Sequence, residues 1–166
     1  MLKTLIVIVL SAASAYLISF FPLLHLARQP TIQPIQFNHK IHIAGEEMAC
    51  KECHIHVEDG AVAGRPRLKG CMECHESEAS ENPEEHKIRE FQGDIPWKRL
   101  YQLPEHVYFS HRLHVTVAEI NCEVCHGAMA HQEKPPSEAL KKLTMTECIG
   151  CHDEEKASRD CMACHR

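Results

Sequence analysis

The sequence contains little material for an ordinary apolar core. Aromatic residues make up 5% of its 166 residues, with a single tryptophan among them. The hydrophobic fraction of 44% includes ten cysteines and a long apolar run at the N-terminus. A chain of this length allows one compact domain or two very small ones. Because few large side chains remain for the interior, we expect something other than side chains to fill it.

A strong charge of either sign is also lacking. The formal net charge is -5 at pH 7, which predicts a mildly acidic surface. Proteins that bind nucleic acids carry a positive patch that attracts the phosphate backbone. We therefore expect no nucleic-acid partner.

No cysteine stands outside one pattern, Cys-x-x-Cys-His, which is the attachment signature of c-type haem. In this signature the two thiols form thioether bonds to the porphyrin, and the histidine becomes the proximal ligand of the iron. A single Cys-x-x-Cys also occurs in zinc sites and redox disulfides. Five copies that all end in histidine favour five covalently bound haems c. The copies are Cys50/Cys53/His54, Cys71/Cys74/His75, Cys122/Cys125/His126, Cys148/Cys151/His152 and Cys161/Cys164/His165.

The N-terminal run predicts a transmembrane helix. Residues 5–26 carry no formal charge apart from a histidine, and as a helix they span about 33 Å. The small residues 13–15 also resemble the cleavage site of a secretory signal peptide. Because the apolar run continues beyond them, we expect the segment to be retained. Residues 1–28 would then be a cytoplasmic tip and anchor in the inner membrane, with residues 29–166 on the periplasmic face, where haem is attached.

An internal repeat precedes two of the attachment motifs. A Phe-x-His-x-x-His segment occurs twice, each time seven residues before a Cys-x-x-Cys-His motif, and the two copies are 72 residues apart. They are Phe37/His39/His42 and Phe109/His111/His114. Duplication explains this spacing better than chance does.

The repeat predicts the organisation of the periplasmic domain. We expect a two-haem module over 35–80, a linker over 81–105, a second two-haem module over 106–155 and a terminal haem over 156–166. The expected fold is mostly irregular, with short α-helices around a chain of c-type haems and one N-terminal transmembrane helix. Within the linker region, the Glu-rich residues 76–90 predict a solvated helix, and residues 95–104 an extended segment.

The four repeat histidines are candidate distal ligands of the haem irons. The repeat resembles the class III multihaem cytochromes c, in which Phe-x-His-x-x-His precedes an attachment motif. The resemblance implies that the first histidine of each copy completes the haem of the motif that follows. His39 would thus pair with His54, and His111 with His126. His42 and His114 would complete other haems.

The fifth distal ligand is left open by the repeat. Met145 stands just before the fourth attachment motif and is our first choice, since a thioether ligand would raise that haem's potential above the others. Met145 packing on a porphyrin face is the competing interpretation. The remaining candidate ligands are His131, His86, His56 and His106.

A longer resemblance covers nearly the whole chain. The segment Ile-Pro-Trp97-Lys-Arg-x-x-x-Leu-Pro-x-x-Val-Tyr108-Phe-Ser-His111, with one N-terminal helix and five motifs, resembles the pentahaem subunit of alternative complex III. Related membrane quinol-oxidising complexes contain similar subunits. The resemblance implies partners: an iron-sulfur subunit, a polytopic quinol-binding subunit, and a periplasmic electron carrier or oxidase. Residues 5–26 would contact the lipid bilayer.

Three functions are compatible with these features. We expect an electron-carrier subunit that is not itself an enzyme and that relays electrons from quinol oxidation to a periplasmic acceptor. A stand-alone membrane quinol dehydrogenase is a second possibility, since the anchor is fused to the haem domain. A multihaem reductase is a weaker one, because it needs an open haem site, whereas candidate ligands here exceed the demand.

Overall fold

A computed structural model describes residues 2–26, 30–77 and 80–165. The chain divides into two units, residues 1–31 and residues 32–166. Each unit is described by itself, and the second is called the haem-motif unit because it contains all five attachment motifs.

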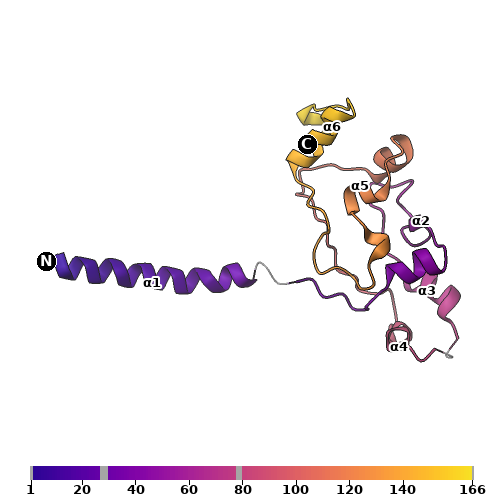
Figure 1. Ribbon diagram of the computed structural model, residues 1–166, viewed down its shortest axis with the longest axis horizontal. Helices are drawn as coiled ribbons and strands as arrows, with labels where there is room; N and C mark the ends of the chain where they lie inside the picture. The colour runs from indigo at the N-terminus through magenta and orange to yellow at the C-terminus, as the bar shows by residue number, and fades with distance from the viewer. Residues whose placement is uncertain (1, 27–29, 78–79, 166) are drawn as a thin grey trace. The chain divides into compact units, whose positions relative to one another are not determined.

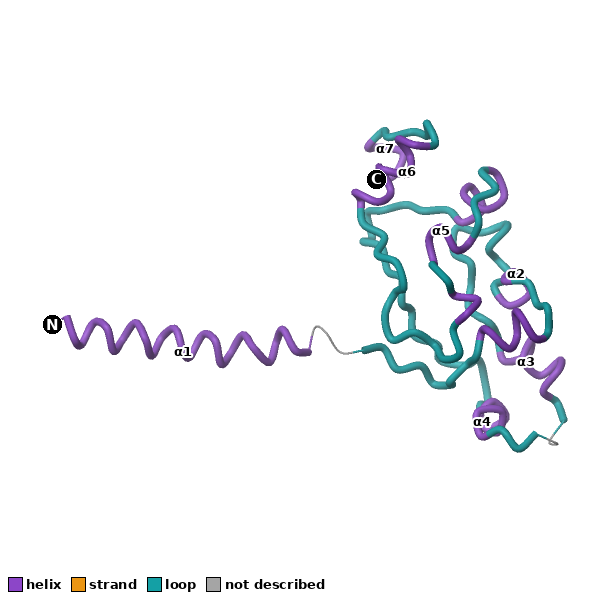
Figure 2. The backbone as a smooth tube through the Cα atoms, viewed as in Figure 1, coloured by secondary structure: helices purple, strands orange, loops and turns teal. Residues whose placement is uncertain are grey.

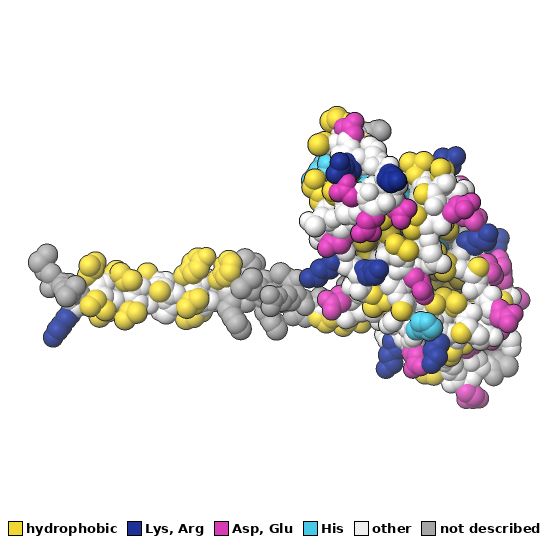
Figure 3. All heavy atoms as spheres, turned by 45° about the horizontal axis from the view of Figure 1, so that its top comes forward, with side chains coloured by type: hydrophobic (Ala, Val, Ile, Leu, Met, Phe, Trp, Pro, Cys, Tyr) yellow, Lys and Arg dark blue, Asp and Glu magenta, His cyan; other side chains and the backbone are white. Residues whose placement is uncertain are grey.

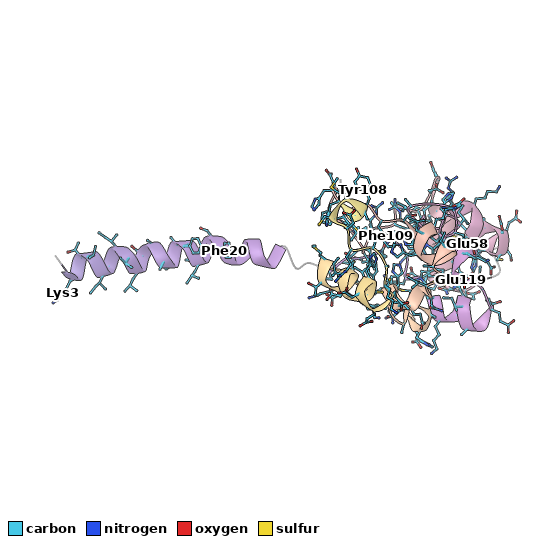
Figure 4. The ribbon with its side chains drawn as sticks, turned by 90° about the horizontal axis from the view of Figure 1, so that it is seen from above. Lys3, Phe20, Glu58, Tyr108, Phe109 and Glu119 are labelled. Atoms are coloured by element: carbon cyan, nitrogen blue, oxygen red, sulfur yellow. The ribbon has the colours of Figure 1, made fainter. Side chains whose placement is uncertain are left out.

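The first unit contains one long helix, α1 (Leu2–Leu26). Its side chains between Lys3 and Phe20 are exposed, and Figures 3 and 4 show the apolar ones around its circumference. The window Lys3–Phe20 has a mean hydropathy of 1.8. A helix of this length and composition is able to cross a bilayer, either as an anchor or as a signal sequence.

The haem-motif unit is built from short helices joined by long irregular segments (Figures 1 and 2). Among its described residues there is no strand, and one isolated antiparallel bridge joins Val107 to His165. The expected fold class, mostly irregular with short helices and one N-terminal apolar helix, is confirmed. The α-helices are α2 (Cys50–Cys53), α3 (Leu68–His75), α4 (Pro83–Glu90), α5 (Cys122–His126), α6 (Met145–Glu154) and α7 (Cys161–Cys164).

The buried apolar core of this unit is small. Among the described residues, the cluster of buried side chains is formed by Ile35, Ile88 and Ile95, which are 3%, 8% and 5% exposed. Ile88 belongs to α4 and Ile95 to the extended segment that follows it. The partly buried side chains packed on this cluster are Leu68, Cys71, Met72, Phe91 and Trp97.

Helix α4 has clear local causes. The Asn82 side chain accepts a hydrogen bond from the Glu84 N–H at 3.0 Å, and Pro83 occupies the first turn, where its missing N–H costs nothing. The Glu-rich residues 76–90 are therefore helical over 83–90. They are less solvated than expected, because Ile88 turns into the core.

The sequence repeat is also a structural repeat. Each Phe-x-His-x-x-His segment leads into a π-helical turn, at Ile41–Gly45 and at Arg112–Val117. Glu47 and Glu119, which are 72 residues apart, follow these turns with φ of 56° and 54°. Such π-helical turns are rare in proteins, and those that occur are often found at functional sites. The two copies thus share an unusual backbone as well as a sequence.

The two copies contact each other reciprocally. The Lys40 N–H donates to the Gln132 carbonyl at 3.1 Å, and the Arg112 N–H donates to the Gly60 carbonyl at 3.0 Å. Lys40 and Arg112 are equivalent in the repeat, and so are Gly60 and Gln132. Residue i of one copy therefore contacts j of the other, and j contacts i, as in an isologous dimer interface. At this contact the two copies of the repeat are related by a local pseudo-twofold arrangement.

Candidate haem sites

Each attachment motif lies on a short helix. Helices α2, α5 and α7 begin at the first cysteine of their motifs, and α3 and α6 contain theirs. Side chains three residues apart lie on the same face of a helix, so both cysteines of a motif point the same way. The ten cysteines are exposed or half-buried, and none is in a disulfide. These pairs present the groups that thioether attachment requires.

In each copy of the repeat, the ring of the phenylalanine contacts both histidine rings. The Phe37 ring meets the His39 ring edge-on with centroids 4.9 Å apart, and stacks on the His42 ring at 4.4 Å. The second copy repeats this arrangement at 4.9 and 4.4 Å around Phe109, which Figure 4 labels. Each phenylalanine therefore fixes the direction of two imidazoles. Sequence reasoning noted these phenylalanines in the pattern but gave them no role.

The described histidines approach one another in pairs. Metal–imidazole bonds are about 2 Å long, so two rings that bind one metal from opposite sides have centroids roughly 6 Å apart. The rings of His111 and His126 are 6.3 Å apart and parallel within 5°. The next two pairs join a repeat histidine to the proximal histidine of a second motif: His42 with His75 at 6.1 Å, and His114 with His152 at 6.2 Å.

His39 lies close enough to His54 for their charges to interact. Burial, followed by the positive charges of His54 and His42, lowers the pKa of His39 to about 4. The pKa of His126 is likewise lowered by burial and by neighbouring histidines, with His111 first. Neutral imidazole is the form that binds a metal. Both electrostatic environments favour the ligating form.

The fifth proximal histidine has a partner that the repeat does not predict. The rings of His106 and His165 stack with centroids 5.4 Å apart and planes 26° apart. The bridge between Val107 and His165 aligns these two segments, and the Tyr108 N–H donates to the Cys164 carbonyl at 2.8 Å. The geometry therefore supports His106 as the distal ligand of the terminal haem.

Met145, our first choice from the sequence, lies elsewhere. It is the first residue of α6 and is 65% exposed, and His152 on the same helix faces His114. The three remaining candidate histidines are exposed: His56 is 3.5 Å from the Asp59 carboxylate, and His86 and His131 lie on α4 and a 3-10 turn. Methionine ligation stays a prediction, with less support than His106.

The Nδ1 atoms of the motif histidines have different partners. Backbone carbonyls accept from Nδ1 of His54 (Gly64, 3.0 Å) and of His152 (Ser158, 2.6 Å). Nδ1 of His75 instead lies 3.2 Å from the Glu85 carboxylate. A hydrogen bond with Ser80 contributes most to the lowered pKa of Glu85, so this carboxyl is ionised at neutral pH.

The attachment motifs follow one another in space in a different order from the sequence. Interactions between cysteines of different motifs indicate which motifs lie close together. The neighbours are Cys122 beside Cys50, Cys53 beside Cys71, Cys148 and Cys151 beside Cys125, and Cys164 beside Cys148. In space the attachment motifs therefore follow the order second, first, third, fourth, fifth.

Comparisons with known proteins agree with this site. The model of the class III cytochrome C family matches residues 25–93, and that of cytochrome c7 and related cytochromes c matches residues 107–166. The multihaem cytochrome c subunit of menaquinone reductase from Nitratidesulfovibrio vulgaris strain Hildenborough is 32% identical over 162 residues, covering 81% of this chain and 77% of that protein. The chain belongs to the class III and c7-type multihaem cytochromes c. Membership implies covalent haem c and an electron-carrying role.

The residues of this cytochrome fit such a group. Cysteines are grouped in pairs on helix faces, imidazoles approach one another at distances that a metal could bridge, and the apolar core is too small for a unit of this size. When bound, haem c supplies reversible one-electron oxidation and reduction. Sequence reasoning identified the attachment motifs and the repeat. It gave no role to Glu85 and left His106 among several candidate ligands, because neither residue lies in a repeated pattern.

Proposed function

We propose that this cytochrome binds five haems c, each between two histidines, and relays electrons as a subunit of a membrane quinone-oxidoreductase complex. The observation that carries the proposal is the set of histidine pairs, since a histidine on either side of each iron leaves no position for a substrate. The pairs are His39/His54, His42/His75, His111/His126, His114/His152 and His106/His165.

The protein's own residues have three tasks in this proposal. The cysteine pairs hold each haem, the paired histidines fix its iron, and the reciprocal contact between the modules sets the spacing of the first and third motifs. The continuous row of motifs supports transfer over short steps. An open-site reductase is disfavoured, because every proximal histidine has an imidazole partner.

Helix α1 supports attachment to the inner membrane, with the haem-motif unit on the periplasmic side. The proposed partners are a polytopic quinone-binding subunit, an iron-sulfur subunit and a periplasmic carrier or oxidase. Alternative complex III is one assembly of this kind. The name of the menaquinone reductase relative specifies reduction of menaquinone, whereas quinol oxidation is the opposite direction. In this proposal the reduction potentials of the two partners set the direction of transfer through the chain.

The test compares two preparations in detergent from the native membranes: the chain alone, and the chain in complex with its partner subunits. We expect five haems per chain by pyridine haemochrome and intact mass, and haem reduction by a menaquinol analogue only when the polytopic partner is present. Reduction of the isolated chain by menaquinol would support a stand-alone dehydrogenase instead. Catalytic turnover of nitrite or a sulfur oxyanion by the isolated chain would contradict the relay.

A further inference from the structure

The contact of the His75 ring with the Glu85 carboxylate differs from the backbone hydrogen bonds made by His54 and His152 at the first and fourth motifs. His75 Nδ1 and Glu85 Oε2 are 3.2 Å apart, and the two side chains are 26% and 24% exposed. A contact this shielded from solvent is screened less by salt than a surface ion pair. It places a carboxylate on the ring nitrogen opposite the one that would bind iron.

The fold holds Glu85 in this position. Glu85 stands one helical turn before Ile88, so both project from the same face of α4. Ile88 packs in the core cluster with Cys71 and Met72 of α3, the helix that ends at His75. Glu85 also lies in the first turn of α4, where the helix dipole favours a negative charge.

The acceptor decides how basic the ring is. A carboxylate that accepts the Nδ1 proton of a ligating histidine gives the imidazole more anionic character and raises its basicity as a ligand. A more basic ligand stabilises ferric over ferrous iron and lowers the reduction potential. The Gly64 and Ser158 carbonyls, which are neutral, do this less for His54 and His152.

We propose that Glu85 is a positioning residue that lowers the reduction potential of the haem attached at Cys71 and Cys74, acting through His75. The inference rests on the proposed haem attachment. That haem would adjoin the haem of the first motif, since Cys71 lies beside Cys53. A lowered potential at the second motif would favour electron transfer from its haem to that of the first.

The test is the full-length Glu85→Gln variant, with a redox titration followed by low-temperature electron paramagnetic resonance. Glutamine keeps a neutral acceptor, so the ligand geometry is retained while the charge is lost. We expect one low-spin component to titrate at higher potential, with about a tenfold change in its oxidised-to-reduced ratio at fixed potential, which is 59 mV for a one-electron couple. The His42→Ala variant assigns this component: the low-spin signal that it loses belongs to the haem held by His75.

Glu84→Gln is the matched control. It removes the same charge one residue away, but the Glu84 carboxylate accepts from the Gln36 N–H and Lys87 and does not touch His75. We expect it to leave that component unmoved. An unshifted potential in Glu85→Gln, an equal shift in Glu84→Gln, or conversion to high spin would overturn the inference. If those results come with five low-spin haems in the unaltered chain, the proposed function stands. A haem count below five would overturn both.

Discussion

The imidazole rings of His111 and His126 lie parallel within 5°, with their centroids 6.3 Å apart. His111 is fixed from both sides, because its Nδ1 donates to the Ala61 carbonyl at 2.9 Å and its ring meets Phe109 edge-on. The contact to Ala61 crosses from one module to the other. We therefore expect haem ligation by His111 to depend on the backbone near Ala61.

We expect His111→Ala to convert one haem from low to high spin, because His126 then has no imidazole opposite it. His131→Ala is the matched control, since this exposed histidine has no ring partner among the described side chains. Electron paramagnetic resonance of both variants checks the prediction. A high-spin signal in His131→Ala, or its absence in His111→Ala, would refute the pairing.

Gly127, directly after His126, is expected to tolerate no side chain. Its φ is +67° with ψ near -165°, a conformation essentially restricted to glycine, and an added Cβ would lie 3.2 Å from the Leu140 Cβ. Gly127→Ala should lower the free energy of unfolding by about 1–3 kcal/mol. Gly70→Ala, in open space within α3, should raise it by about 0.5–1 kcal/mol. Thermal melts of the two haem-loaded variants compare them, and equal effects would disprove this account of Gly127.

The reciprocal contact between modules predicts a stability effect at Thr116. Its hydroxyl donates to the Glu58 carbonyl at 2.7 Å, across 58 residues of chain. Thr116→Val keeps the shape but loses this bond, which should cost about 0.5–1.5 kcal/mol in denaturant unfolding. Thr116→Ser keeps the hydroxyl and should cost less. If the serine variant is as unstable as the valine variant, the hydroxyl is not what joins the modules.

Helix α1 is expected to remain in the mature protein as the membrane anchor. The intact mass of the protein from native membranes should then include residues 1–31 and five haems, and the protein should stay in the membrane after an alkaline carbonate wash. If the measured mass corresponds to a chain that begins near residue 16, and the protein is released into the periplasm, the segment is a signal peptide.

The sequence predicts those parts of this protein that are encoded locally. The fold class follows from the attachment motifs, and the repeat follows from two segments at constant spacing. His106 is only one of several candidates in the sequence, because its partner His165 is brought to it by a bridge between distant segments. Glu85 is indistinguishable within a Glu-rich run, since its role depends on Ile88 packing against α3. Long-range packing leaves no local pattern to read.

The most direct test of the account is low-temperature electron paramagnetic resonance on the full-length protein with His106→Ala and Met145→Leu. The account predicts only low-spin haem in the unaltered chain and in Met145→Leu, and one high-spin haem in His106→Ala. A high-spin haem in Met145→Leu with none in His106→Ala would make methionine the fifth ligand. A high-spin haem in the unaltered chain that responds to a small substrate would contradict the electron relay itself.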